Sequence, residues 1–175
     1  GLVGSAVLES FKKNKFSNII TISKKNLDLT NSSSVINFLK KKKPSHVVMC
    51  AAKVGGIKEN SQKPAEFYYQ NSMIQNNIIH GSYLSGVKKL IFLGSSCIYP
   101  KFSKQPIDES ELMNGKLEVT NQAYAISKIS GVEMCRSYNI QYGTNYKCLM
   151  PTNLYGPNDS YDLDKSHFFA AAIRK

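Results

Sequence analysis

The feature that most constrains the fold is an alternation between short apolar runs and longer helical segments. Four runs rich in β-forming residues occupy residues 19–22, 46–52, 89–94 and 146–150. The longer of these runs are continuously apolar rather than alternating between apolar and polar residues. Continuous apolar runs are typical of parallel strands that helices cover on both faces. The sequence therefore predicts an α/β fold with a doubly wound parallel sheet.

The segments between the predicted strands have the composition and the end signals of helices. We predict a helix from Gly4 to about Lys15, a second capped by Asn31 or Ser32 and running to about Lys42, a third from Pro64 to Leu84, and a fourth that contains Tyr124 and continues through Tyr138. Pro64 suits the first turn of a helix, where its missing N–H costs nothing. The loop from 100 to 121 separates the third strand from the fourth helix.

Gly1 and Gly4 stand at the start of the first predicted helix. Their spacing matches the last two glycines of the phosphate-binding turn in a Rossmann-like dinucleotide fold. One small residue there lets a pyrophosphate approach the helix N-terminus, and the other allows close packing of helix on strand. The first glycine of that turn and the strand before it are absent. We therefore expect a Rossmann-like sheet truncated at its first strand, in a chain that is a fragment.

Composition and charge exclude several classes of protein. The 175 residues suffice for one hydrophobic core. The sequence contains no run of 18 apolar residues, so we expect no membrane-spanning helix. The net charge is +11, but only 2 of the 23 basic residues are arginines, which argues against a nucleic-acid partner. The densest basic run, 40–43, ends a predicted helix, where the helix dipole favours cations. The four cysteines show no metal-type spacing, so we expect reduced thiols, no metal and a cytoplasmic protein.

Tyr124 and Lys128 form the clearest candidate for a catalytic pair. They lie four residues apart in a helical run, so both side chains share one helix face. A nearby cation favours the phenolate and lowers a pKa that is ordinarily about 10. Such a tyrosine exchanges a proton with a substrate oxygen, and Ser95, at a strand end, would hydrogen-bond the same oxygen. These residues indicate carbonyl reduction or alcohol oxidation.

The spacing alone does not select this pair, because Tyr161 and Lys165 repeat it. The second pair follows the turn-forming run 156–159 and spans two aspartates, which is typical of a loop. No strand-end serine precedes it. We interpret Tyr161 and Lys165 as an ordinary surface pair.

Four longer sequence motifs make the assignment of a function more specific. They are Ala51-Ala-Lys-Val-Gly-Gly-Ile57, Leu93-Gly-Ser-Ser-Cys-Ile-Tyr-Pro100, Tyr124-Ala-Ile-Ser-Lys128 and Met150-Pro-Thr-Asn-Leu-Tyr-Gly-Pro157. Together they resemble the GDP-L-fucose synthases, a family of extended short-chain dehydrogenases/reductases that acts on sugar nucleotides, and the resemblance covers essentially the whole chain. It implies epimerisation of GDP-4-keto-6-deoxy-D-mannose at C3 and C5, followed by reduction at C4 with NADPH to give GDP-L-fucose.

The resemblance implies catalytic roles for five side chains. Ser95, Tyr124 and Lys128 match the reductase triad. Tyr124 would protonate the C4 oxygen, Ser95 would hold it, and Lys128 would tune the phenol and bind the nicotinamide ribose. Cys97 and His167 match the two acid/base groups of the epimerisation. Without the resemblance, Cys97 reads as a buried thiol and His167 as a surface histidine.

The resemblance also implies NADP as the cofactor, a GDP-sugar as the substrate and a homodimer. The implied cofactor contacts are Gly1, Gly4, Lys24, Ala51 and Lys128, and the implied substrate contacts are Asn153 and Lys175. Lys24 is equally readable as a surface lysine, and Asn153 as part of a turn. Residues 1–157 would form the NADP-binding domain, and 158–175 the beginning of a substrate-binding region. We therefore expect this chain alone to be inactive.

Two other kinds of function stay open. One is a different sugar-nucleotide enzyme of the same fold, either a 4-epimerase or a 4,6-dehydratase. A dehydratase is expected to carry an acidic pair after the Ser95 position, where this chain has Ser96 and Cys97, and a 4-epimerase does not need Cys97. The other is a non-catalytic dinucleotide-binding module in which the triad is vestigial.

Overall fold

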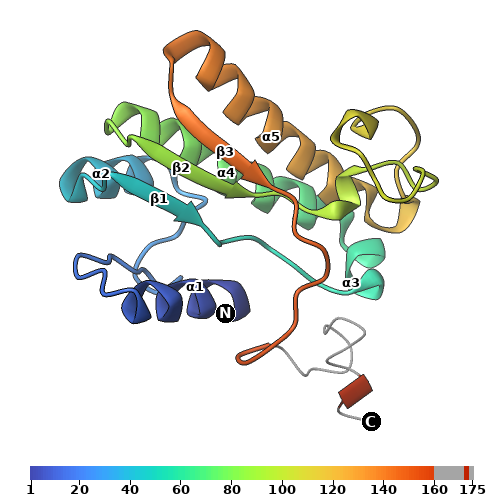
Figure 1. Ribbon diagram of the computed structural model, residues 1–175, viewed down its shortest axis with the longest axis horizontal. Helices are drawn as coiled ribbons and strands as arrows, with labels where there is room; N and C mark the ends of the chain where they lie inside the picture. Colours follow the sequence, from blue (N-terminus) through green and yellow to red (C-terminus); the bar gives the residue numbers. More distant parts are fainter. Residues whose placement is uncertain (160–171, 174–175) are drawn as a thin grey trace.

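A parallel sheet forms the centre of the computed structural model, which describes residues 1–159 and 172–173. Its strands are β1 (His46–Met49), β2 (Lys89–Leu93) and β3 (Asn145–Leu149), hydrogen-bonded in the order β1-β2-β3 (Figure 1). The register places Val47 beside Leu90, and Leu90 beside Tyr146. The strand predictions for 46–52, 89–94 and 146–150 are confirmed, each within a few residues of its bounds.

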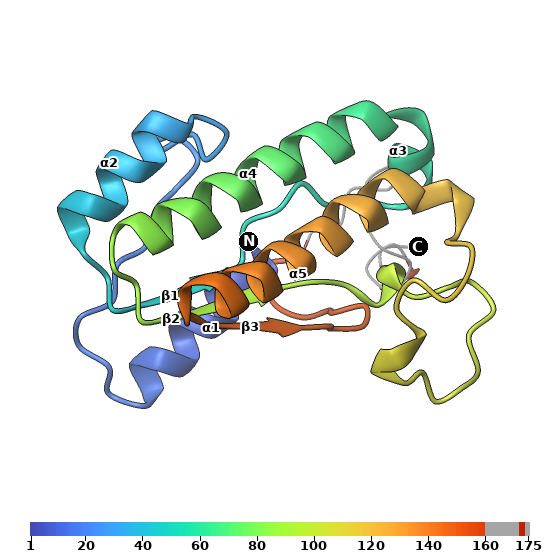
Figure 2. The same cartoon turned by 90° about the horizontal axis from the view of Figure 1, so that it is seen from above.

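Helices lie on both faces of this sheet, as Figures 1 and 2 show. One face carries α2 (Ser32–Lys42), α4 (Pro64–Leu84) and α5 (Gln122–Tyr142), and the other carries α1 (Leu2–Lys13). The short helix α3 (Ile57–Gln62) and the 3-10 turns η1 (Ser96–Ile98), η2 (Glu109–Glu111) and η3 (Val119–Asn121) lie in the connections. The doubly wound α/β prediction is confirmed. None of the described helices is long and apolar enough to cross a membrane.

Local end signals explain the helix bounds. The Asn31 side chain accepts a hydrogen bond from the Ser34 backbone N–H at 2.9 Å and so caps the first turn of α2. Pro64 is the first residue of α4. Gly143 follows α5 with a φ of 64°, the left-handed conformation that commonly ends a helix.

The strand predicted at residues 19–22 is wrong. The structure has irregular chain there, and Ile20 and Ile22 are 42% and 38% exposed. A strand is held by hydrogen bonds to a neighbouring strand, and the described residues contain no strand that pairs with 19–22. The β-forming side chains alone therefore do not produce a strand.

The core fixes how closely α5 approaches β2. Leu90 and Phe92 on β2 are fully buried, and Phe92 lies directly against Gly131 of α5. A Cβ atom at Gly131 would collide with the Phe92 ring and with the Gln75 side chain of α4. This close approach brings the first turns of α5 to the carboxyl end of β2, where the candidate site lies.

Candidate active site

Four of the predicted site residues gather at the carboxyl end of β2. The chain leaves β2 at Leu93 and turns into η1, and the Ser95 hydroxyl oxygen accepts the Cys97 backbone N–H at 3.3 Å. From α5, Lys128 extends its side chain to this edge and donates from Nζ to the Leu93 carbonyl oxygen at 2.8 Å. Tyr124 lies one turn earlier on the same helix. Ligands of doubly wound folds bind outside the carboxyl ends of the strands, so this position suits an active site.

Tyr124 is largely buried, and its surroundings hold it as a neutral phenol. Burial, together with the nearby Cys97 side chain, raises the pKa of Tyr124 to about 12, while hydrogen bonding with Ser95 acts in the opposite direction. The Tyr124 ring also meets the Phe67 ring edge to face, with centroids 6.3 Å apart. A buried neutral phenol can donate a proton to a substrate oxygen.

The expected lowering of the Tyr124 pKa by Lys128 is wrong for this structure. Burial lowers the pKa of Lys128 itself to about 8. Its Nζ lies 5.8 Å from the centroid of the Tyr124 ring and 5.0 Å from that of Phe92, and it hydrogen-bonds a backbone oxygen. Desolvation is the largest influence on the pKa of each side chain, and it acts against the charged form of both.

Cys97 has a hydrogen-bond partner that sequence reasoning missed. Asn121 donates from Nδ2 to the Cys97 sulfur at 3.3 Å. Asn121 stands at the N-cap of α5, where asparagine commonly accepts a backbone hydrogen bond, but its side chain makes no cap bond here. The preference of asparagine for helix starts is the only sequence signal at this position, and it indicates a cap rather than a contact with Cys97.

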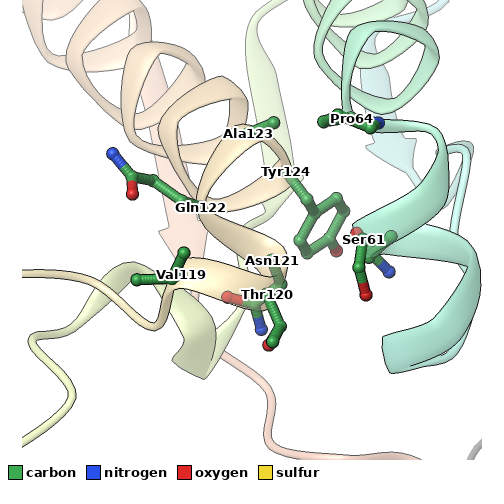
Figure 3. A pocket seen from close by; sticks show the side chains of 9 residues that line it. Ser61, Pro64, Val119, Thr120, Asn121, Gln122, Ala123 and Tyr124 are labelled. Atoms are coloured by element: carbon green, nitrogen blue, oxygen red, sulfur yellow. The ribbon is translucent and has the colours of Figure 1, made fainter.

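A pocket of about 240 Å³ opens beside Tyr124. Residues 119–124 line one side of it, and Asn60, Ser61 and Pro64 line the other. Figure 3 shows the Tyr124 ring between these two walls, with Asn121 and Thr120 beneath it. The pocket can therefore present a small ligand to the phenol of Tyr124.

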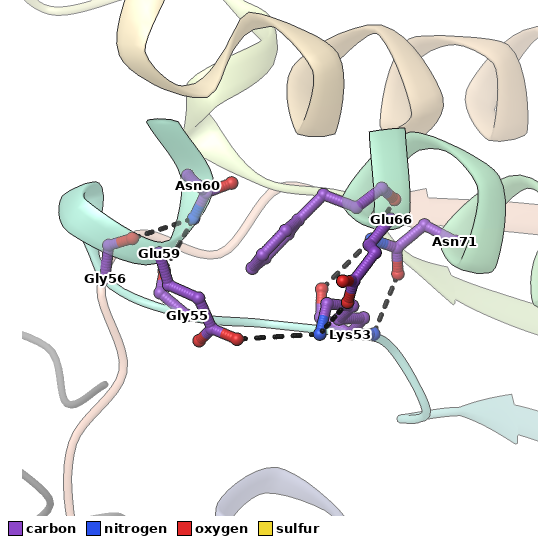
Figure 4. Close-up of polar contacts among 8 residues, drawn as sticks. Lys53, Gly55, Gly56, Glu59, Asn60, Glu66 and Asn71 are labelled. Carbon is purple, nitrogen blue, oxygen red and sulfur yellow. Dashed lines mark hydrogen bonds and ion pairs between the residues drawn. The ribbon is translucent and has the colours of Figure 1, made fainter. Parts of the chain in front are cut away.

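A second group that the sequence did not reveal surrounds Lys53, in the loop after β1 (Figure 4). The Asn71 side chain on α4 accepts from the Lys53 backbone N–H at 2.9 Å and donates to the Lys53 carbonyl oxygen at 3.0 Å. The Lys53 ammonium pairs with Glu59 at 3.5 Å and Glu66 at 3.3 Å, and it lies over the Phe67 ring, 5.0 Å from its centroid. Because Phe67 contacts Tyr124, this network joins the loop to the wall of the site.

Asn71→Ala should lower the free energy of unfolding of the full-length protein by about 2–3 kcal/mol, because it removes the partners of buried backbone groups. Besides its two bonds to Lys53, Asn71 donates to the Phe67 carbonyl oxygen at 2.9 Å. Urea unfolding measures the change. The matched control is Asn76→Ala, on an exposed position of the same helix, with an expected change below about 0.5 kcal/mol. Equal small effects of the two variants would contradict this role for Asn71.

Three of the predicted cofactor contacts, Gly1, Gly4 and Ala51, lie near the carboxyl end of β1. Gly1 caps α1, and a Cβ atom at Gly4 would lie 3.7 Å from the Cβ of Cys50, directly after β1. Ala51 is the next residue. The N-terminus of a helix thus lies at the carboxyl end of a parallel strand, the arrangement that accepts a dinucleotide pyrophosphate.

The structure does not place the remaining predicted site residues beside Ser95, Cys97, Tyr124 and Lys128. Lys24 is exposed in a turn and helps to lower the pKa of Asp28, after the larger effect of hydrogen bonds from Thr30. Asn153 is exposed in the segment after β3. His167 and Lys175 lie outside the described residues, as do Tyr161 and Lys165. Within the described ranges, no cluster of His, Cys, Asp and Glu side chains is placed to hold a metal ion.

Comparison with known proteins identifies the family. A model of the NAD dependent epimerase/dehydratase family matches residues 1–175. The chain belongs to this family. Among curated members, it is 52% identical to a GDP-L-fucose synthase of Sinorhizobium fredii and 47% identical to that of Escherichia coli, in both cases over the whole chain. It spans about half the length of these relatives, 55% and 54% respectively.

A solved structure has the same fold. This is a GDP-mannoheptose C4 reductase from Campylobacter jejuni with NADP bound. It is 42% identical and superimposes with a TM-score of 0.93, over 99% of this chain and 52% of the reductase. This similarity agrees with the Rossmann-type arrangement of strands and helices described above.

Proposed function

We propose that the protein containing this chain is a 3,5-epimerase and 4-reductase that converts GDP-4-keto-6-deoxy-D-mannose to GDP-L-fucose with NADPH. The observation that carries this proposal is that Ser95, Cys97 and Tyr124 lie together at the carboxyl end of β2, with Tyr124 at the edge of a pocket and held as a neutral phenol. A reductase needs the phenol, and an epimerase also needs a second acid/base group such as the thiol. The identity to two GDP-L-fucose synthases supports the substrate.

In the reduction, Tyr124 gives its proton to the C4 oxygen of the sugar. Bound NADPH would supply the hydride. Ser95 holds the same oxygen by a hydrogen bond, which aligns it with the phenol. Lys128, anchored at the Leu93 carbonyl, keeps an ammonium donor beside the site and would contact the nicotinamide ribose.

In the epimerisation, Cys97 exchanges protons at C3 and C5. The C4 ketone acidifies these positions, and inversion requires a group on each face of the sugar. Asn121 fixes the thiol from one side through its bond to the sulfur. His167 is the proposed partner on the opposite face.

NADP is the proposed cofactor, held by Gly1, Gly4, Ala51 and Lys128, with Lys24 at the 2′-phosphate. The solved reductase with NADP bound supports this choice. Residues 1–157 would form the NADP-binding domain. Residues 158–175 would begin the substrate-binding region, in which Lys175 contacts the GDP-sugar, together with Asn153 from the preceding segment.

We also propose a homodimer, formed through the helices α4 and α5. Both helices expose large apolar side chains, among them Tyr69 at 62% and Ile140 at 73%. Exposed apolar side chains of this size commonly mark protein–protein contacts.

Supplying the full-length protein with GDP-4-keto-6-deoxy-D-mannose and NADPH in D₂O tests the function. We expect GDP-L-fucose that carries deuterium at C3 and C5, as identified by NMR. A product that keeps the manno configuration at both carbons would contradict the epimerase assignment. Reduction of a GDP-4-keto-heptose but not of the deoxyhexose would favour a second candidate, a GDP-heptose C4 reductase, which the 42% identity to the Campylobacter enzyme supports.

A further inference from the structure

The side chain of Gln75 crosses from α4 to α5 in the interior of the molecule. Gln75 is fully buried, and its Nε2 donates to the Ser127 carbonyl oxygen at 2.6 Å and to the Ser130 hydroxyl oxygen at 2.9 Å. Figure 2 shows the two helices side by side. Ser127 lies in the helical turn between Tyr124 and Lys128. A buried amide of α4 thus binds the backbone between two residues of the candidate site.

The partners of Gln75 fix the orientation of its amide. The Ser127 carbonyl oxygen can only accept a hydrogen bond, so the amide nitrogen and not the amide oxygen must face it. The Ser130 hydroxyl donates its own hydrogen to the same carbonyl oxygen at 2.8 Å, so toward Gln75 it can only accept. The contact therefore requires a donor on α4, which an apolar side chain cannot supply.

Close packing leaves the Gln75 amide little room to move. Gly131 lies one turn beyond Ser127 on α5, and a Cβ atom there would collide with the Gln75 amide and with the Phe92 ring. The Phe92 ring also faces the Lys128 ammonium, which lies 5.0 Å from the ring centroid. The amide, the ring and the ammonium are therefore packed together, and the position of one affects the others.

Core packing alone does not explain an amide at this position. The Oε1 atom of Gln75 is buried and has no hydrogen-bond partner among the described residues. A buried acceptor without a donor destabilises a protein. A methionine has a similar length, fills irregular gaps well and would leave no such acceptor on α4. The Ser127 carbonyl oxygen would still have the Ser130 hydroxyl as a donor. The amide is therefore better explained by what it holds on α5.

We propose that Gln75 is a positioning residue for Tyr124 and Lys128. Its amide holds the Ser127 turn of α5 at a fixed distance from α4, and the Ser127 hydroxyl donates in turn to the Tyr124 carbonyl oxygen at 2.6 Å. Proton transfer from a phenol needs a separation of about 2.6–3.2 Å from the substrate oxygen, and a misplacement of about 1 Å costs about 10²-fold in rate. This inference rests on the proposed function, because it treats Tyr124 as the proton donor of the reduction.

Gln75→Met in the full-length protein tests the inference. Methionine keeps the length of the side chain but cannot donate to Ser127. When NADPH is mixed with enzyme already equilibrated with GDP-4-keto-6-deoxy-D-mannose, the single-turnover rate constant for NADPH oxidation should fall about 10–100-fold, with its amplitude retained. A loss of folded protein would lower the amplitude and leave the rate constant unchanged, because each remaining molecule would react at the wild-type rate. The rate constant therefore separates mispositioning from instability.

Hydrogen exchange followed by mass spectrometry gives a readout that does not depend on the reaction. The backbone amides of residues 124–131 should exchange about 10-fold faster in Gln75→Met, and those of residues 136–142 should exchange at the wild-type rate. Ser130→Ala removes the second partner of the amide and should give the same two changes at about 3-fold, so the test does not depend on one variant. Gln141→Met is the matched control, the same change at an exposed position near the other end of α5, and should leave the rate within about two-fold.

Two results would overturn the role of Gln75. One is a wild-type rate constant in Gln75→Met, and the other is unchanged hydrogen exchange over residues 124–131. Failure of the wild type to oxidise NADPH with this sugar would count against the proposed function. In that case hydrogen exchange alone would decide whether Gln75 holds the turn that carries Tyr124 and Lys128.

Discussion

Tyr124→Phe in the full-length protein should lower kcat for NADPH-dependent reduction by about 10²–10⁴-fold, the usual contribution of a positioned general acid. The phenylalanine ring keeps the edge-to-face contact with Phe67, so the fold and NADP affinity should change little. Because burial holds the pKa of Tyr124 at about 12, the wild-type phenol stays protonated across the neutral and moderately alkaline range. We therefore expect no fall in rate from deprotonation of Tyr124 below about pH 11.

The control for this variant is already present in the chain. Tyr161→Phe alters the second tyrosine that has a lysine four residues later, and it should leave the rate within about two-fold of the wild type. Stopped-flow and steady-state oxidation of NADPH measure both variants. A full rate in Tyr124→Phe would contradict the reductase mechanism, and so would an equal loss in the two variants.

The sequence predicted the fold where local signals and tertiary packing agree. The helix at 64–84 has the predicted ends, because Pro64 fixes its first turn and the apolar residues that follow pack on the sheet. The prediction at 19–22 failed because a strand depends on a hydrogen-bonded neighbour, which β-propensity within the segment does not report. Strand predictions from apolar runs are therefore secure only where a partner strand can be named.

Some residues of the candidate site could be predicted from the sequence, and others could not. Ser95, Tyr124 and Lys128 were predicted from a strand end and from helical spacing, and Cys97 from the family resemblance. The structure brings these four residues together at the carboxyl end of β2. Asn121 was missed because its contact with Cys97 spans 24 residues of sequence. The predicted direction of the Tyr124 pKa shift was also wrong, since a spacing of four residues does not reveal the burial that raises this pKa.

Cys97→Ser should separate the two halves of the proposed reaction. The serine hydroxyl can still accept the hydrogen bond from Asn121, but it loses a proton far less readily than a thiol and is a poor base. Exchange of deuterium at C3 and C5 should therefore fall by about 10²–10⁴-fold, while the Tyr124 centre continues to oxidise NADPH at a reduced rate. NMR of the sugar product in D₂O measures the exchange.

The sugar product of Cys97→Ser is more informative than the exchange rate. If hydride transfer occurs without inversion at both carbons, the product keeps the configuration of the substrate at C3, at C5 or at both. Cys148→Ser is the matched control, a half-buried thiol on β3, and it should give the wild-type product. Cys97→Ser could instead keep the full rate of deuterium exchange and lose only the reduction. That result would contradict the acid/base role of Cys97 in the epimerisation, and the bond from Asn121 to its sulfur would then be structural. Loss of exchange with reduction retained would mean that one site contains two separable proton donors, with the Tyr124 phenol acting at C4 and the Cys97 thiol acting at C3 and C5.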